Sequence, residues 1–465
     1  MADTPLVVDA LNFLTRYFMP VDKLGKKTPA WRLLAATKTM VEGFLEACAA
    51  SGYSPHFVID AGWKSDEAAK KWTKRREAEC RRGERAIPLN ADTFLAELLR
   101  EAGAPVYQVE GEDGDDIAAV LAYTLGKNSL ILSEDRDMFR YVFIEDAGSR
   151  VMVDFSFEVP ANGGPVTLVF HPSTTQRVKD GVADRTLSDM PTCDIAQWSS
   201  PTNKLSVVTH NPRKGYVRGC CSPWTRRFGN LHGITRPLRL AAYHALGHTT
   251  GVFEKFPEWN DDGECVRWEE GDVTPDPDPV LMEMLGRPAE CLDWLTKRDP
   301  GAEDDSSRDG TFRCFARYGI VAEITAAVKG GSATVLSQMR ELCDGKFEGF
   351  RDGDSKERWP PTDRVCHRIR CSERGCGVSF VVPAGEKKFL AEKGFGMPKR
   401  CKPCRERAKS RRSPGGGGGT KPRDSPPLSV SARPFRLTPP RTLPPRPKPA
   451  SEVETITKKM DELKN

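Results

Sequence analysis

Carboxylates recur at the ends of short apolar segments in the first third of this 465-residue chain. Asp9 ends the run LVVD, and Asp60 ends HFVID. Two further groups follow the apolar runs VYQV and SLIL, and their members are Asp113, Asp115, Asp116, Asp135 and Asp137. If these runs are parallel strands, their carboxyl ends share one edge of a sheet, where ligands bind in open α/β folds. We therefore expect the carboxylates to converge.

Converging carboxylates repel one another unless cations neutralise them. Mg²⁺ and Mn²⁺ prefer hard oxygen ligands and usually keep several waters. Two such ions about 4 Å apart can activate a water molecule and stabilise the leaving oxygen of a phosphodiester. The acidic residues therefore predict hydrolysis of phosphodiester bonds with Mg²⁺ or Mn²⁺ as the cofactor.

Each carboxylate also has a simpler interpretation. Asp115 and Asp116 would favour a helix N-terminus through its dipole. Asp60 precedes an Ala-Gly pair and suits a turn, while Asp135 and Asp137 could lie in a solvated loop. Acids at all four strand ends favour the catalytic interpretation over four separate coincidences.

A strongly basic segment follows Asp60 and is expected to be a helix over residues 68–82. Its candidate nucleic-acid-binding residues are Lys70, Lys71, Lys74, Arg75, Arg76, Arg81 and Arg82. Cations close to the acids could guide a phosphate backbone to the metal ions. An ordinary solvated helix face explains the same charges equally well.

Strand and helix signals alternate through residues 1–150. Strands are expected at residues 6–10, 56–60, 106–109, 129–132 and 151–157, and helices at 31–50, 92–102 and 113–125. This alternation predicts an α/β sandwich around a mainly parallel sheet. Residues 151–345 are expected to form a mostly helical extension, with helices at 236–246 and through much of 279–343.

Two cysteine pairs mark a small module over residues 364–410. The pairs are Cys371 with Cys376 and Cys401 with Cys404. Four thiolates in a tetrahedron form the usual structural Zn²⁺ site, and the neighbouring Cys366 and His367 could replace one ligand. Reduced core cysteines are the alternative, but so short a segment cannot build a core of its own. We therefore expect structural Zn²⁺.

The C-terminal region has the composition of a linker and tail. Residues 411–450 contain GGGGG and PPRTLPPRPKP, which predicts a disordered segment. Residues 451–465 fit a short amphipathic helix with an apolar stripe that could dock on a protein partner. A frayed tail fits a helix of this length as well.

Charge and hydropathy exclude several classes of protein. The net charge is only +5, so the chain as a whole is not a basic coat for nucleic acid. It starts without a signal peptide and contains no apolar run of about 18 residues, which predicts no membrane association. We expect an intracellular protein, nuclear or cytoplasmic, whose 14 cysteines are thiols or metal ligands.

Four segments, in order, resemble PIN-like nucleases of the XPG/flap-endonuclease superfamily. They are VVDALNFLTRYF, FVIDAG, GEDGDDIAAVLA and LSEDRDMF, and they span residues 5–145. The resemblance implies a PIN-like three-layer sandwich and metal ligation by Asp9, Asp60, Asp113, Asp115, Asp116, Asp135 and Asp137. Two features depart from that pattern: Asp113 stands where the family has Glu, and the Gly-x-Gly loop that grips duplex DNA is absent from the sequence.

Two further resemblances concern the later parts of the chain. GNLHGITRPLRLAAYHAL is similar in layout to the Asteroid-like branch, which includes members with weak or no activity. The cysteine module is similar to a small zinc-ribbon family with Lys-Gly-Phe and Arg-Cys-x-x-Cys-Arg segments.

Three functions are consistent with these patterns. The first is a metal-dependent nuclease, structure-selective or directed to single strands of DNA or RNA. The second is a catalytically weak or inactive nucleic-acid-binding scaffold of the same fold. The third is an interaction protein that acts through its zinc ribbon and proline-rich tail.

Overall fold

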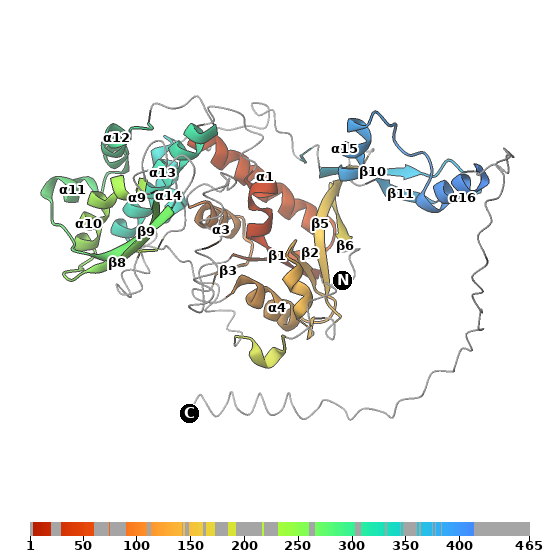
Figure 1. Ribbon diagram of the computed structural model, residues 1–465, viewed down its shortest axis with the longest axis horizontal. Coiled ribbons are helices and arrows are strands. Elements are labelled where there is room, and N and C mark those ends of the chain that lie inside the picture. The colour runs from red at the N-terminus through yellow and green to blue at the C-terminus, as the bar shows by residue number, and fades with distance from the viewer. Residues whose placement is uncertain are drawn as a thin grey trace, which may run out of the picture. The chain divides into compact units, whose positions relative to one another are not determined.

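The computed structural model (Figure 1) describes most of the chain up to Arg412, with gaps. The described residues are 3–19, 29–59, 74, 90–108, 113–141, 143–144, 148–160, 164–172, 185–191, 216–217, 231–259, 266–302, 308–330, 333–344, 346, 360–361, 364–373, 375–376, 378–382 and 384–412. Asp60, the basic segment apart from Lys74, most of the expected linker and the whole expected terminal helix lie outside them.

A parallel sheet forms the centre of the N-terminal part. Its strands are β1 (Thr4–Asp9), β2 (Tyr53–Val58), β3 (Val106–Tyr107), β4 (Leu130–Leu132) and β5 (Arg150–Glu158). They lie in the order β3-β2-β1-β4-β5, and every neighbouring pair is parallel. β6 (Thr167–Pro172) pairs antiparallel with β5. The predicted α/β class with a mainly parallel sheet is confirmed.

Helices cover both faces of this sheet. Leu6 and Val8 of β1 belong to a large core with α1 (Ala30–Ala50) and α3 (Ala91–Glu101). Val7 belongs to a second core with α4 (Gly114–Leu125). Successive residues of a strand point to opposite faces, so a strand buried on both faces is apolar throughout. This explains why β1 reads as an unbroken apolar run.

Two short helical turns carry the chain from β1 into the larger core. They are η1 (Ala10–Phe13) and η2 (Leu14–Phe18). The ring of Tyr17 packs edge-on against Phe155 of β5 at a centroid distance of 5.0 Å, and Phe44 of α1 meets Phe155 at 5.2 Å. Aromatic pairs with such geometry add to the energy of burial, so they fix the segment that follows Asp9.

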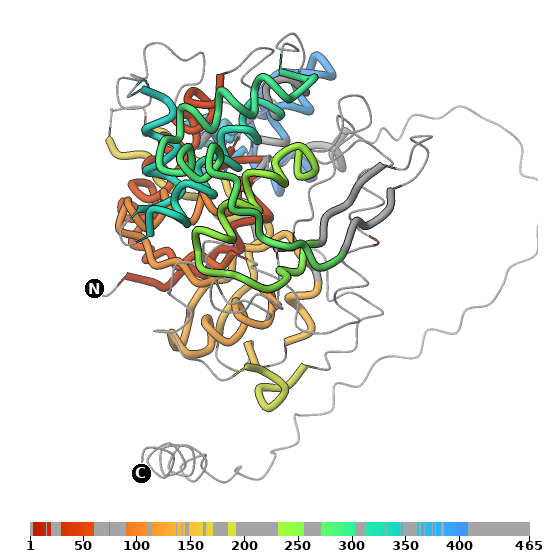
Figure 2. Tube along the Cα trace, turned by 90° about the vertical axis from the view of Figure 1, so that its left-hand side faces the viewer, coloured from red at the N-terminus to blue at the C-terminus, as the bar shows by residue number. Residues whose placement is uncertain are grey.

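The extension contains strands as well as helices, where the sequence predicted mostly helix. Its helices are α9 (Leu231–Ile234), α10 (Arg236–Ala245), α11 (Pro279–Met284), α12 (Pro288–Arg298), α13 (Arg308–Lys329) and α14 (Val335–Leu342). Figure 2 shows them, coloured green to teal, gathered into one group. An antiparallel hairpin of β8 (Val252–Trp259) and β9 (Val266–Val273) accompanies them, with β7 (Tyr216–Val217) beside β8. Among the described residues, no helix has the length and apolarity needed to cross a membrane.

A buried ionic cluster ties the hairpin to α10. Glu254 of β8 accepts hydrogen bonds from Arg239 at 2.7 Å, from Tyr243 at 2.9 Å and from Arg236 at 3.0 Å. Burial alone would raise the pKa of Glu254, but the charge and hydrogen bonds of these partners outweigh burial and lower that pKa. A charged residue therefore occupies a core position of the strand.

The cysteine module is attached to the central sheet. β10 (Val365–Arg370) pairs in parallel with the end of β5, through Val365 with Phe157 and Cys366 with Glu158. β11 (Ser379–Val382) pairs antiparallel with β10, and α15 (Ala384–Glu392) and α16 (Lys402–Arg412) follow. The sheet that starts with β1 therefore extends well beyond residue 150.

One arginine holds the start of β10 against the aromatic core. Arg364 donates to Asp154 at 2.7 Å and to the carbonyl of Phe155 at 3.2 Å, and its guanidinium lies 4.7 Å from the Phe155 ring centroid. Arg368, in contrast, pairs with Glu158 on the exposed side of β10. A buried cation over a ring contributes more than an exposed ion pair.

We therefore predict that Arg364→Met lowers the free energy of unfolding by about 2 kcal/mol. The matched variant Arg368→Met should cost only about 0.5 kcal/mol. Urea denaturation measures both, and hydrogen exchange of residues 365–370 should accelerate only in the first variant. Equal costs for the two arginines would contradict this account of the junction.

Candidate functional site

The order in which the chain adds strands to the sheet reverses beside β1. The chain runs from β1 to β2 and β3 on one side, and then crosses to β4 and β5 on the other. In open parallel sheets, ligands bind at the carboxyl ends of strands at such a switch point. Val8 of β1 pairs with Leu132 of β4, so Asp9 and Ser133 leave the sheet next to each other. The site therefore begins with these two residues.

Ser133 connects the carboxylates of two neighbouring strands. Its hydroxyl donates to Asp9 Oδ2 at 2.9 Å, and it accepts the backbone N–H of Asp135 at 3.1 Å. Asn12 also donates to Asp9 Oδ2. Hydrogen bonds of this kind fix the direction of a carboxylate. The structure thus brings Asp9 and the Asp135 segment together through Ser133, which is not among the predicted site residues.

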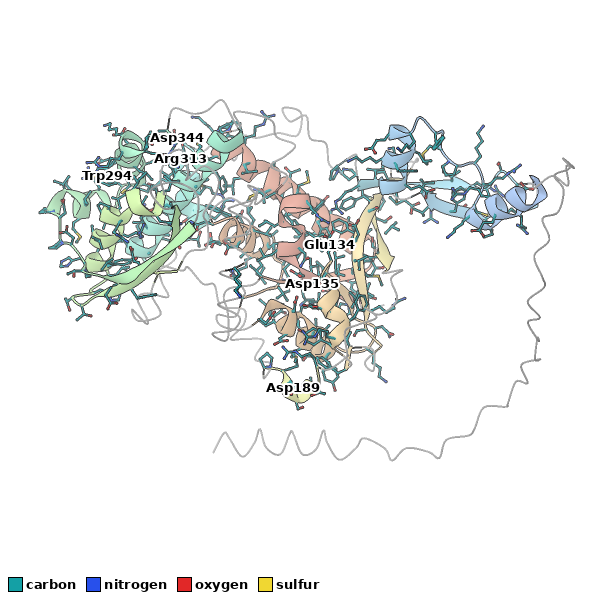
Figure 3. The ribbon with its side chains drawn as sticks, in the orientation of Figure 1. Glu134, Asp135, Asp189, Trp294, Arg313 and Asp344 are labelled. Atoms are coloured by element: carbon teal, nitrogen blue, oxygen red, sulfur yellow. The ribbon has the colours of Figure 1, made fainter. Side chains whose placement is uncertain are left out.

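Asp135 begins a short helical turn, η4 (Arg136–Arg140). Its Oδ1 accepts the backbone N–H of Asp137 at 2.9 Å, which is the bond of an N-cap. The preceding Glu134 pairs with Arg16 of η2, and Figure 3 labels Glu134 and Asp135 close to each other. The cap holds the Asp135 carboxylate at the edge of the sheet, where it remains partly exposed.

The third acidic group lies at the start of α4, which packs on β1 and β4. Asp113 is its N-cap and accepts the backbone N–H of Asp115 at 3.1 Å. Burial raises the pKa of Tyr141, and the hydrogen bond and charge of Asp116 and the charges of Asp115 and Asp113 raise it further. The three carboxylates therefore act on one hydroxyl and lie in one neighbourhood.

Asp116 is engaged with protein groups on both oxygens. Arg185 Nη2 lies 2.6 Å from Oδ1 and 2.8 Å from Oδ2, and Tyr141 donates to Oδ1 at 2.7 Å. The residue is only 3% exposed. Arg185 follows Asp116 by 69 residues, and nothing in the local sequence indicates the pairing. A carboxylate bound in this way anchors the start of α4.

The described carboxylates do not form a closed metal cage. Within the described residues, the donor atoms of four cysteines lie within 4.8 Å of one another and could hold a metal ion. The described carboxylates form no such group of three or more. Neighbouring carboxylates repel one another, and here Asp9, Asp113 and Asp135 accept N–H and O–H donors. Of the predicted nucleic-acid-binding cations, only Lys74 is described, and it is helical and exposed.

The cysteine centre joins a hairpin to a helix. Cys371 directly follows β10 and Cys376 precedes β11, so this pair lies in the hairpin turn. Gly375 supplies the positive φ, +79°, that the turn requires. Cys401 precedes α16 and Cys404 lies in its first turn. The four sulfurs lie within 4.8 Å of one another.

The geometry fits one tetrahedral zinc ion. Zn–S bonds of about 2.3 Å require neighbouring sulfurs about 3.8 Å apart, and Cys376 Sγ lies 3.8 Å from Cys401 Sγ. Burial alone would raise the pKa of Cys371, but hydrogen bonds, led by those from the backbone N–H groups of Cys401 and Glu373, outweigh it and lower that pKa to about 7. At Cys376 and Cys401, backbone hydrogen bonds alone would lower the pKa, but burial and hydrogen bonds with the other thiols outweigh them and raise the pKa. A helix N-terminus also favours the thiolates that zinc binds. Cys366 lies outside the cluster, in the strand β10.

Comparison with known proteins identifies this module. A family model described as a probable treble clef domain matches residues 367–413. No curated protein matches the chain. The C-terminal region is therefore a treble-clef, zinc-binding region. The match and the four clustered cysteines support the expected zinc ribbon, whose second ligand pair comes from the start of a helix.

The two candidate fourth ligands can be separated by substitution. We predict that Cys404→Ser abolishes stoichiometric zinc binding and unfolds the module, because three thiolates with a hydroxyl hold zinc poorly. Cys366→Ala should keep one zinc per chain. Metal analysis after gel filtration and hydrogen exchange over residues 371–404 measure both effects. Zinc retained by Cys404→Ser, or lost by Cys366→Ala, would contradict the assignment of the tetrad.

Asp116 and Asp115 can be compared in the same way. Asp116→Asn should lower the free energy of unfolding by about 1 to 3 kcal/mol, because it weakens a buried bond to Arg185. Asp115→Asn should change it by less than about 0.5 kcal/mol. Both are measured by urea denaturation without divalent cations. An Asp116→Asn protein with the same free energy of unfolding as wild type would contradict the structural role of this carboxylate.

Proposed function

We propose that the N-terminal α/β region hydrolyses phosphodiester bonds of nucleic acids with Mg²⁺ or Mn²⁺. The observation that carries the proposal is the connection of Asp9 to the Asp135 segment through Ser133 at the switch point of the sheet. Oxygen ligands at the carboxyl ends of parallel strands suit hard divalent cations.

The acidic residues would divide into two roles. Asp9 and Asp135 would bind the first ion, with Asp60, Asp113, Asp115 and Asp137 as further ligands. Ions held there supply an activated water and stabilise the leaving oxygen. Asp116 would position α4, because Arg185 and Tyr141 occupy its oxygens. Ser133 and Asn12 would orient the Asp9 carboxylate.

The order of the motifs supports the same proposal. The resemblance to PIN-like nucleases of the XPG/flap-endonuclease superfamily concerns the segments that carry these acids. The cations of residues 70–82 would hold the phosphate backbone near the carboxylates. The substrate class that follows is single-stranded or branched DNA or RNA, because the sequence lacks the family's duplex-gripping loop.

A nucleic-acid-binding scaffold is the second candidate. The observation that favours it is the saturation of Asp116 by Arg185 and Tyr141, which withdraws one expected ligand. Asp113, one methylene shorter than the Glu of the related motif, also reduces the reach of a ligand. A scaffold would keep binding and lose turnover.

A cleavage assay separates the two candidates. Wild-type protein with Mn²⁺ should cleave at least one of a panel of single-stranded, flapped and hairpin DNA and RNA substrates. Asp9→Asn and Asp135→Asn should each lower the rate by about 100-fold or more, because each removes a metal ligand. Their affinity for the substrate should stay the same or rise, since a negative charge is lost.

The matched control is Asp344→Asn. Asp344 has an 81% exposed side chain outside the site, and its substitution should leave the rate unchanged. The metal-free control is a reaction without added divalent cation, because a chelator would also remove the zinc of the cysteine centre. Binding without cleavage of any substrate would establish the scaffold, and full activity in Asp9→Asn would place the metal elsewhere.

A further inference from the structure

Two exposed aromatic residues, Phe389 and Phe395, lie at the end of α15. Phe395 N–H donates to the carbonyl of Leu390 at 2.7 Å, and Gly394 N–H donates to Ala391 at 3.1 Å. This pair of bonds, with a positive φ of +68° at Gly394, is the Schellman motif that ends many helices. The motif folds Phe395 back beside the last turn of the helix, which also carries Phe389.

Both rings are turned towards solvent. Phe389 is 53% exposed and Phe395 is 62% exposed, and no other phenylalanine of the described residues is an exposed large apolar side chain. Met397 nearby is 37% exposed. Exposed apolar side chains lack the favourable free energy that burial would provide. Clusters of such residues mark interaction sites. The cysteine module therefore presents an aromatic face.

Exposed lysines lie close to Phe389 and Phe395 along the chain. Lys388, Lys393, Lys399 and Lys402 are exposed and form no ion pair with any described residue. Two arginines of the module are paired instead, Arg400 with Glu373 at 2.8 Å and Arg405 with Glu386 at 3.3 Å. A surface of aromatic rings and unpaired lysines would complement a polyanion that has exposed rings of its own.

The strand register places the module on the acidic side of the sheet. β10 is parallel to β5, so its carboxyl end points the same way as the ends of β1 and β4. β5 runs six residues past Met152, which pairs with the last residue of β4, a length of about 20 Å. β10 begins at that level and leads to Cys371. The module is thus attached beyond the edge that carries Asp9 and Asp135.

We propose that the aromatic face of Phe389 and Phe395, with Lys388 and Lys393, binds single-stranded nucleic acid. Bases that are free of a partner strand would stack on the two rings, and the lysines would contact the phosphates. A duplex hides the faces of its bases, so single strands are favoured. Binding at the aromatic face is independent of the proposed nuclease function. The inference that the bound strand continues to the acidic edge rests on that function.

Fluorescence anisotropy with a labelled 15-nucleotide dT or rU strand tests the proposal, using zinc-loaded full-length protein without Mg²⁺ or Mn²⁺. Phe389→Leu with Phe395→Leu should weaken binding about tenfold or more, because it removes both stacking faces and keeps the apolar bulk. Phe389→Tyr with Phe395→Tyr should bind like wild type. Lys388→Gln with Lys393→Gln should weaken binding and lower its salt dependence.

The control variant is Lys297→Gln with Lys346→Gln, which removes two exposed lysines outside the module and should leave affinity unchanged. Zinc content and circular dichroism confirm that each variant is folded. Equal affinity of the leucine and tyrosine variants would overturn the proposal. So would a leucine variant that loses binding to phosphatidylserine vesicles and keeps its affinity for the oligonucleotide. Because cleavage is not measured, an inactive acidic site would leave this result unaffected.

Discussion

The parallel pairing of β1 with β2 on one side and β4 on the other is the constraint on which the candidate acidic site depends. Val7 faces one core while Leu6 and Val8 face the other. A slip of one residue would exchange these faces, so the register is fixed by burial on both sides. That register sets Asp9 beside Ser133. The apolar interior thereby determines where the carboxylates leave the sheet.

Polar groups in this protein fall into two classes with different consequences. Asp116 and Glu254 are nearly fully buried, and charged or hydroxyl partners saturate them. Such clusters fix the positions of α4 and of the β8–β9 hairpin, because an unpaired buried charge is costly. Asp9 and Asp135 are only partly buried and accept neutral donors. Under the proposed function, these two carboxylates would bind a divalent cation.

The sequence predicted the elements that depend on local pattern. The apolar runs became β1, β2, β3 and β4, and the paired spacing of the cysteines selected the four that cluster. It did not predict the hairpin, because buried Glu254 interrupts the apolar alternation of β8. The attachment of β10 to β5 and the pairing of Arg185 with Asp116 join residues far apart in the chain, and no local signal encodes them. The roles of Asp60 and the basic segment stay predictions, since they lie outside the described residues.

The central claim is that Asp9 and Asp135 bind a catalytic cation at the switch point between β1 and β4. Crystals grown with Mn²⁺, measured at a wavelength where manganese scatters anomalously, test it most directly. We expect an anomalous peak within about 2.5 Å of oxygens of both carboxylates, with hard oxygen ligands completing the coordination. The peak should disappear in Asp9→Asn crystals, while the zinc signal at the cysteine centre persists. Manganese bound only elsewhere, or a peak unchanged in Asp9→Asn, would contradict the account.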